Sequence, residues 1–276
     1  GWALASRGFY SMVDSETSTI EIIRFRDGGF SHETIAHLPY LHRFDTLAAP
    51  DGTRYIAAAT LHSGKVDKAD WSKPGHFFFG VLPEDADNAF EIELQQLPGD
   101  FYMNHGYCKG EWKGREVAFI AAKEGVFVFL PPEKRGGEWT REQLMDFPVS
   151  DIAVCDIDGD GEKEIAALLP FHGNQFKVFH RENAGYKEVF SYPVENDFYH
   201  AIISGRIGGE LMFIGGARKL AADTFLVRWD AWAGEFFTQQ LETGSGPSNL
   251  AILNSARGDY LLSANRMIFE AAVYRF

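Results

Sequence analysis

Five short apolar runs recur along this chain, and each breaks off at a polar or basic residue. The runs are RYIAAATLHSGK, EVAFIAAKEGVFVF, KEIAALLPFHGNQFKVF, GELMFIGGARKLAADTFLVRW and DYLLSANRMIFEAAVYRF. The residues at the breaks lie 61, 49, 46 and 48 positions apart, and they are His62, Lys123, His172, Arg218 and Arg266. A period near this length, built from short β-type runs, is typical of a β-propeller. We therefore predict an all-β fold in which residues 1–276 form one β-propeller domain.

A second series of residues precedes the first by 18 to 22 positions. Its members are His42, His105, Ser150, His200 and Ser248. In a propeller the second series would open the innermost strands, and the first would end the next strands outward. Because blades are arranged around one axis, residues at equivalent positions converge. The spacing therefore predicts one mouth rich in histidine and basic side chains.

The repeat divides the chain into about six blades. Their predicted bounds are 1–39, 40–100, 101–147, 148–196, 197–245 and 246–276. The first and last are shorter than the others, so we expect one terminus to supply a strand to the other terminal blade and remove an exposed edge. A seventh blade would need a segment that this sequence does not show.

The charge and the cysteine content exclude several classes of protein. A net charge of −13 argues against nucleic acid or an anionic membrane as a partner, because both need a positive surface. No run approaches the ~20 apolar residues of a membrane span. Cys108 and Cys155 are the only cysteines, which excludes a disulfide-built scaffold. The opening GWALASRGFY is too short and too polar for a signal peptide. We also expect the protein to be a monomer.

The segment DIDGDGEKE has the spacing of a calcium-binding loop. Oxygen ligands at alternate positions can surround a hard cation, and Gly161 permits the sharp turn. The loop lacks the distal glutamate and the helices of an EF-hand, and it resembles the calcium-binding turns of FG-GAP and VCBS-type propeller repeats. The alternative is an acidic turn without metal. We predict a structural Ca²⁺ held by Asp156, Asp158, Asp160, Glu162 through its carbonyl, and Glu164.

The histidines of the two series suit two tasks. One is metal ligation, in which a zinc or other transition-metal ion would use His42, His105 and His200, with Cys108 as a further candidate. The other is proton transfer on an anionic substrate. Nearby cations would oppose a metal ion but would hold a carboxylate well, which favours an acidic carbohydrate as the ligand. In the long insertion at residues 64–76, Trp71 is a candidate for stacking on a sugar ring.

Residues 40–130 resemble a known family of enzymes. The strings TLHSGK, DWSKPG and NHGY, with His42, His62, Tyr107 and a cation at position 123 in that order, are similar to the β-propeller polysaccharide lyases that act on ulvan and on rhamnosyl-glucuronate termini. The resemblance implies that two histidines and a tyrosine transfer protons and that an arginine neutralises the uronate carboxylate. Lys123 stands where that arginine is expected. The family has seven blades, and the resemblance implies an extracellular or periplasmic protein.

The reaction implied by this resemblance is β-elimination at a uronic acid, which leaves a 4,5-unsaturated sugar. The base would be His42 or His62, and Tyr107 would be the acid that assists the leaving oxygen. The substrate-binding residues would be His105, Lys123, His172, His200, Arg218, Arg266 and Trp71. One alternative is a glycoside hydrolase of the rhamnosidase type, for which Asp45 and Glu124 are the nearest carboxylates. The other is a non-catalytic propeller that binds a glycan or a protein.

Overall fold

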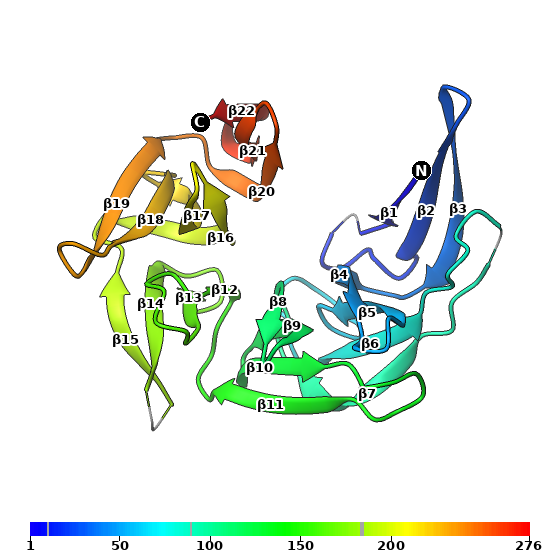
Figure 1. Cartoon of the computed structure of the whole chain (residues 1–276). Coiled ribbons are helices and arrows are strands. Elements are labelled where there is room, and N and C mark those ends of the chain that lie inside the picture. The colour runs from blue at the N-terminus through cyan, green and yellow to red at the C-terminus, as the bar shows by residue number, and fades with distance from the viewer. Residues whose placement is uncertain (10, 89, 183–184) are drawn as a thin grey trace. The chain divides into compact units, whose positions relative to one another are not determined.

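The computed structural model describes residues 1–9, 11–88, 90–182 and 185–276. Within these ranges the chain forms strands, turns and one short 3-10 helix, η1 (Arg266–Ile268). No helix among them has the length and hydropathy of a transmembrane helix. The chain divides into two compact units, Gly1–Gln143 and Leu144–Phe276 (Figure 1), and each unit is described by itself.

The first unit contains three antiparallel sheets. The first sheet is β1 (Trp2–Arg7), β2 (Thr19–Arg26) and β3 (Gly29–His37). The second sheet is β4 (Leu41–Ala48), β5 (Arg54–Thr60), β6 (Gly75–Val81) and β7 (Gln95–Phe101). The third sheet is β8 (Gly106–Trp112), β9 (Arg115–Ala122), β10 (Gly125–Leu130) and β11 (Thr140–Met145), whose last two residues fall in the second unit.

The second unit repeats this plan with three more sheets. The fourth sheet is β12 (Asp151–Cys155), β13 (Glu164–Leu169), β14 (Gln175–Glu182) and β15 (Gly185–Ser191). The fifth sheet is β16 (Asn196–Ile207), β17 (Glu210–Leu220), β18 (Thr224–Asp230) and β19 (Glu235–Glu242). The sixth sheet is β20 (Pro247–Ser255), β21 (Gly258–Asn265) and β22 (Glu270–Arg275).

The six sheets are the six blades of a β-propeller. In every sheet the strands follow chain order and pair antiparallel with their neighbours, which is the topology of a propeller blade. The predicted fold class is confirmed, and each predicted blade contains one sheet. The expected strand exchange between the termini is wrong, because the two terminal sheets each consist of three consecutive strands from their own end of the chain.

Burial explains why the middle strands read as unbroken apolar runs. Every residue of β10 and of β13 is buried, and six of the seven residues of β5 are. A strand with both faces covered needs apolar side chains at every position, whereas a half-exposed strand alternates. The fourth strands differ: β7, β11 and β19 are exposed or half-buried at nearly every position and rich in polar residues. The outer edge of each four-stranded blade therefore faces solvent.

Aromatic rings fill the space between successive sheets. In the second unit Phe225 is fully buried, stacks on Tyr192 with ring centroids 3.6 Å apart, and meets the edge of Phe176 at 5.0 Å. Gly215 lies opposite Phe225 in the β17–β18 pair, and a Cβ at this position would come within 2.4 Å of the Phe225 ring. The missing side chain of Gly215 thus makes the room that the ring occupies.

We expect Phe225→Ala to lower the free energy of unfolding by about 3–5 kcal/mol, because it leaves a cavity among rings that are packed on all sides. The control is Phe237→Ala on the neighbouring strand, where the side chain is 48% exposed and the loss should stay within about 0.5 kcal/mol. Urea unfolding of both variants measures the difference. Equal losses would contradict the packing described here.

Candidate functional site

The two predicted series lie where the spacing places them on the strands. In the first unit His42 is the second residue of β4, His105 directly precedes β8, and Lys123 directly follows β9. In the second unit Ser150 precedes β12, while His200 lies in β16 and Ser248 in β20. His172 follows β13, Arg218 lies near the end of β17, and Arg266 follows β21. The convergence of both units' residues on one mouth stays a prediction, as does the metal set His42, His105 and His200.

His42 and His105 form a pair in the first unit. Their ring centroids are 4.5 Å apart, and Phe9 meets the His42 ring edge-on at 5.3 Å. The Nδ1 of His42 lies 3.2 Å from the His105 carbonyl oxygen, which can only accept, so this nitrogen carries the proton. Nε2 is then the basic nitrogen of the neutral His42 ring. In this tautomer the Nε2 of His42 can accept a proton.

His62 is placed differently, with both ring nitrogens held by the backbone. The ring is fully buried, Nε2 donates to the Met12 carbonyl at 2.6 Å, and the Gly64 N–H donates to Nδ1 at 3.0 Å. Burial lowers the pKa of His62, and the charge of Lys65 acts in the same direction. Taking up a proton would break one of these bonds. The structure therefore gives His62 a structural position at the start of the insertion.

Tyr107 also faces inward. Its hydroxyl oxygen is shielded from solvent and has no hydrogen-bond partner, and its ring packs against the apolar cluster that includes Leu47 and Phe129. Burial raises the pKa of Tyr107 well above its usual value, and the charge of Asp45 adds to the effect. This is the packing position of a strand aromatic between two sheets.

The insertion after β5 holds a cation–π pair. The Nζ of Lys65 lies 3.2 Å from the centroid of the Trp71 ring, and Lys65 is only 9% exposed. Burial lowers the pKa of Lys65. Because the ammonium group covers one face of the Trp71 indole, a sugar would have only the other face to stack on. Sequence reasoning missed Lys65, since nothing in the repeat marks it.

The carboxylates considered for hydrolysis are tied to backbone amides. The Asp45 carboxylate accepts the Thr46 N–H at 2.6 Å, and the Glu124 carboxylate accepts the Tyr102 N–H at 2.9 Å. Burial raises the pKa of both. Asp45 lies within β4, and Glu124 lies in the β9–β10 turn.

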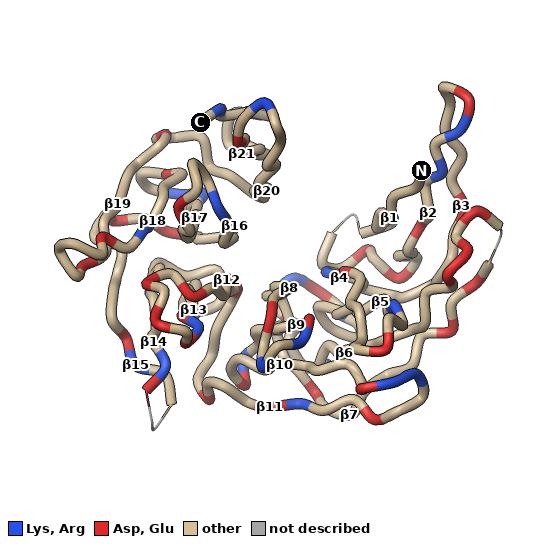
Figure 2. Tube along the Cα trace, viewed as in Figure 1, with Lys and Arg blue, Asp and Glu red and all other residues tan. Residues whose placement is uncertain are grey.

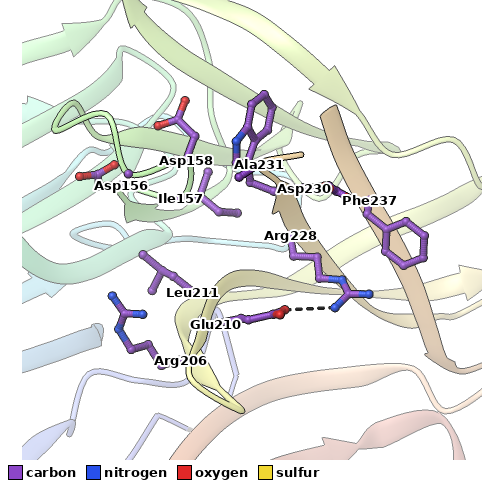
Figure 3. A pocket seen from close by; sticks show the side chains of 12 residues that line it. Asp156, Ile157, Asp158, Arg206, Glu210, Leu211, Arg228, Asp230, Ala231 and Phe237 are labelled. Atoms are coloured by element: carbon purple, nitrogen blue, oxygen red, sulfur yellow. Dashed lines mark hydrogen bonds and ion pairs between the residues drawn. The ribbon is translucent and has the colours of Figure 1, made fainter. Parts of the chain in front are cut away.

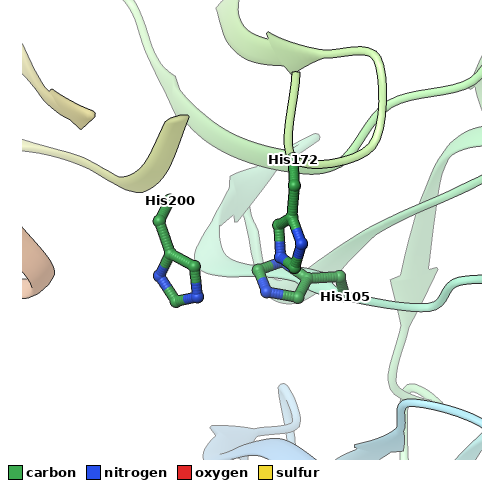
Figure 4. A group of neighbouring side chains, drawn as sticks. All are labelled: His105, His172 and His200. Atoms are coloured by element: carbon green, nitrogen blue, oxygen red, sulfur yellow. The ribbon is translucent and has the colours of Figure 1, made fainter. Parts of the chain in front are cut away.

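The second unit contains a compact group of rings and guanidinium side chains. Its members, which we call the Arg218 cluster, are His172, Phe198, His200, Arg218 and Arg266. The rings of His172, Phe198 and His200 are nearly parallel, with centroids 4.6 to 6.1 Å apart and interplanar angles of 4° to 27°. The two histidines appear in Figure 4. Phe198 was missed by the sequence reasoning because it lies outside both series.

The backbone of the Arg218 cluster holds two residues in an uncommon conformation. His172 has a φ of 47° and Phe198 a φ of 57°, a region that side chains other than glycine rarely adopt. The Ser150 hydroxyl accepts the His172 N–H at 3.1 Å, and the His200 Nδ1 donates to the Ser248 carbonyl at 3.0 Å. Ser150 and Ser248, two members of the second series, therefore hold the two histidines in place. Because Nδ1 of His200 donates its proton, Nε2 is the basic nitrogen of the neutral ring.

The two arginines of the Arg218 cluster form no ion pair among the described residues. The Arg218 guanidinium lies 4.8 Å from the Phe198 ring, and its buried Nε has no hydrogen-bond partner within the described part of the chain. Burial lowers the pKa of Arg218, and repulsion from Arg266 adds to the shift. No carboxylate pairs with either arginine among the described residues. A buried donor with no acceptor is costly, so this arrangement favours an anion.

The acidic loop between β12 and β13 has a donor set that differs from the predicted one. Asp158, Asp160, Glu164 and His180 each offer one ligand atom, and these atoms lie within 4.8 Å of one another. His180 comes from β14 and hydrogen-bonds to Glu164 at 2.7 Å. The Asp156 Oδ2 accepts the Gly161 N–H at 3.2 Å, and the Glu162 carboxylate pairs with Arg181 at 3.2 Å. Three carboxylates that share one space fit a hard divalent cation.

Comparisons with known proteins identify the fold and no family. No family model matches the chain, and no curated protein matches it. A Bacteroides uniformis protein assigned as a 6-phosphogluconolactonase is similar over 99% of this chain and 77% of its own, with 12% identity and a TM-score of 0.62. Trypanosoma rangeli sialidase is similar over 100% of this chain, with 14% identity and a TM-score of 0.57. The chain spans about half of that sialidase, 52% of its length.

His172 gives a test of the site by pH. Burial, with the charges of His200 and Arg218, lowers its pKa to about 3. Since an unfolded histidine titrates near ~6.5, the unfolded chain binds the extra proton first as the pH falls. The stability contributed by neutral His172 is therefore present above pH ~6.5 and is lost as the pH falls toward 3.

Histidine NMR titration checks this, and we expect the His172 ring to show no protonation above pH ~4. A His172→Asn variant should lose part of the decline in stability between pH ~6.5 and 4. An ordinary titration near pH ~6.5 would show that the ring is not buried as described.

Proposed function

We propose that this propeller binds an acidic glycan and that the Arg218 cluster receives the carboxylate of a uronic acid. The observation that carries the proposal is the buried, unpartnered Nε of Arg218 beside a second arginine. A planar guanidinium can hold a carboxylate through two parallel hydrogen bonds. Among the similar structures is the Trypanosoma rangeli sialidase in complex with sialic acid, which is itself a sugar with a carboxylate.

Cleavage next to that uronic acid by β-elimination is the reaction we propose. Pairing of the carboxylate with Arg218 makes the C5 proton easier to remove, because it stabilises the negative charge that develops there. The His200 Nε2 takes the C5 proton, the C–H electron pair becomes the C4=C5 double bond, and the C4–O bond breaks. The imidazolium formed on His200 then returns the proton to the leaving oxygen. This assignment replaces His62 and Tyr107, whose polar atoms are held or buried in the first unit.

A non-catalytic glycan-binding propeller is the second candidate function. The observation that favours it is the placement of His62 and Tyr107, two of the three residues to which the lyase resemblance assigns proton transfer. A chain that keeps the carboxylate-binding arginines while these two groups are held or buried would bind and not cleave.

Arg218→Ala should weaken binding of a glucuronate-capped oligosaccharide by roughly 10- to 150-fold, the equivalent of ~1.5–3 kcal/mol for a hydrogen bond to a charged group. The matched control is Arg257→Ala, an exposed arginine in the β20–β21 turn that lies outside both sites, which should leave the affinity unchanged. Isothermal titration calorimetry measures both variants. Binding that is equal in wild type and Arg218→Ala would contradict the proposed carboxylate site.

The reaction is tested by ultraviolet absorbance of the 4,5-unsaturated product on ulvan and on rhamnosyl-glucuronate-capped arabinogalactan. We expect a rise with the wild-type chain that His200→Ala abolishes, while calorimetry still detects binding by this variant. Binding without any rise in the wild type would support the second candidate and exclude the lyase on these substrates.

We propose further that the β12–β13 loop holds a structural Ca²⁺ through Asp158, Asp160 and Glu164. A cation bound only by the folded state stabilises it by ~2.7 kcal/mol when its concentration is 100-fold above the Kd. Calcium should therefore raise the unfolding temperature of the wild type and not of Asp160→Asn. The control is Asp27→Asn in a β2–β3 turn, which should respond like the wild type. An equal calcium response in Asp160→Asn would contradict this site.

A further inference from the structure

A cleft of about 590 Å³ lies between two sheets of the second unit, away from the Arg218 cluster. Three turns border it: the loop after β12, the β16–β17 turn and the β18–β19 turn. β13 begins at this end of its blade, and His172 follows the other end of the same strand. The cleft, which we call the turn cleft, therefore opens at the end of the strands opposite the carboxylate site proposed above.

The walls of the turn cleft combine aromatic and acidic side chains (Figure 3). Trp229 is one wall, and its ring is fixed by an edge-on contact with Phe236 at 5.0 Å. Phe237 is a second aromatic wall, and the Arg228 guanidinium covers it at 4.7 Å. The apolar floor includes Ile157 and Leu211. A ring-shaped ligand with an apolar face can pack on an indole fixed in this way.

Charge in the turn cleft excludes an acidic ligand. Four carboxylates line it, from Asp156, Asp158, Glu210 and Asp230, and only two guanidinium groups do, from Arg206 and Arg228. With Asp158 assigned to the proposed Ca²⁺, three carboxylates still outnumber the two guanidinium groups. Arg228 is already paired with Glu210 at 3.1 Å, and Arg206 donates to the Gly209 carbonyl at 2.9 Å. A uronate carboxylate would therefore meet net negative charge, which is the reverse of the Arg218 cluster.

One acceptor in the turn cleft has no donor. The Asp156 Oδ1 is shielded from solvent and accepts no hydrogen bond from the described residues, although its Oδ2 accepts from Gly161. Asp156 is also outside the set of four ligand atoms that the acidic loop brings together. Carboxylates can only accept hydrogen bonds, so the acidic lining of the cleft favours a ligand that brings donors such as hydroxyl groups.

We propose that the turn cleft binds an uncharged, hydroxyl-rich sugar residue, with its ring against Trp229 and its hydroxyl groups donating to the carboxylates that line the cleft. The site is separate from the carboxylate site and does not depend on the proposed reaction. In an acidic glycan with alternating uronate and neutral sugars, or in a neutral glycan, it would hold a residue that lacks a carboxylate. The turn cleft would thus bind an uncharged sugar, whereas the Arg218 cluster would bind a sugar with a carboxylate.

Filling the cleft gives the sharpest test. Ala231 lines it, whereas Ala233 lies in the same β18–β19 turn and does not, and both side chains are exposed. Ala231→Trp should therefore block the cleft, and Ala233→Trp is its matched control. Leu211→Trp narrows the cleft from β17, so the test does not depend on the folding of one variant. The probes are the methyl glycosides of rhamnose, galactose and xylose, observed by saturation-transfer NMR.

We expect at least one neutral glycoside to show saturation transfer with the wild type and with Ala233→Trp, and at least a tenfold weaker signal with Ala231→Trp and Leu211→Trp. Methyl glucuronoside should bind all four proteins equally, because its carboxylate uses the Arg218 cluster. Arg218→Ala should lose the glucuronoside and keep the neutral glycoside, which separates failure of one site from failure of the other. No transfer from any neutral glycoside, or equal transfer with the filled cleft, would overturn the proposal.

Discussion

The need to cover both faces of the second and third strands governs the rest of this structure. A strand such as β13, with all six residues buried, is stable only between two other layers, so each sheet must be flanked by another. Small residues on these strands let the large rings of the next sheet approach, as Gly215 does for Phe225. This packing fixes where strands begin and end. The ends of the strands then decide which polar side chains are presented to solvent.

Two ends of the second unit differ in charge for this reason. One end carries His172 after β13, Arg218 near the end of β17 and Arg266 after β21, and no carboxylate is paired with the two arginines among the described residues. At the other end, the loop before β13 and the neighbouring turns carry most of the acidic side chains around the turn cleft. Figure 2 shows that acidic residues are spread widely over the chain. A local excess of positive charge in a protein of net charge −13 therefore needs a partner to stabilise it.

The sequence predicted the blades well because burial has a period that can be read directly. Each of the six predicted segments contains one sheet, and His42, Lys123 and Arg218 lie at the strand ends that the spacing indicated. The contacts of individual side chains could not be predicted this way. His62 is held by the carbonyl of Met12, 50 residues away. The Tyr107 hydroxyl is buried because its side chain lies on the face of β8 that packs against the apolar cluster. His180 joins the acidic loop from another strand, which no local motif encodes.

The central claim is that Arg218 receives a carboxylate, and the Nε–H group of this residue reports on it directly. We would titrate arginine-labelled protein with methyl glucuronoside and follow the Arg218 Nε–H resonance, with methyl glucoside as the uncharged control. The account predicts a saturable shift with the glucuronoside and none with the glucoside, because a buried donor gains an acceptor only from the carboxylate. An Arg218 resonance that stays unchanged at saturating glucuronoside, or that shifts equally with both sugars, would contradict it.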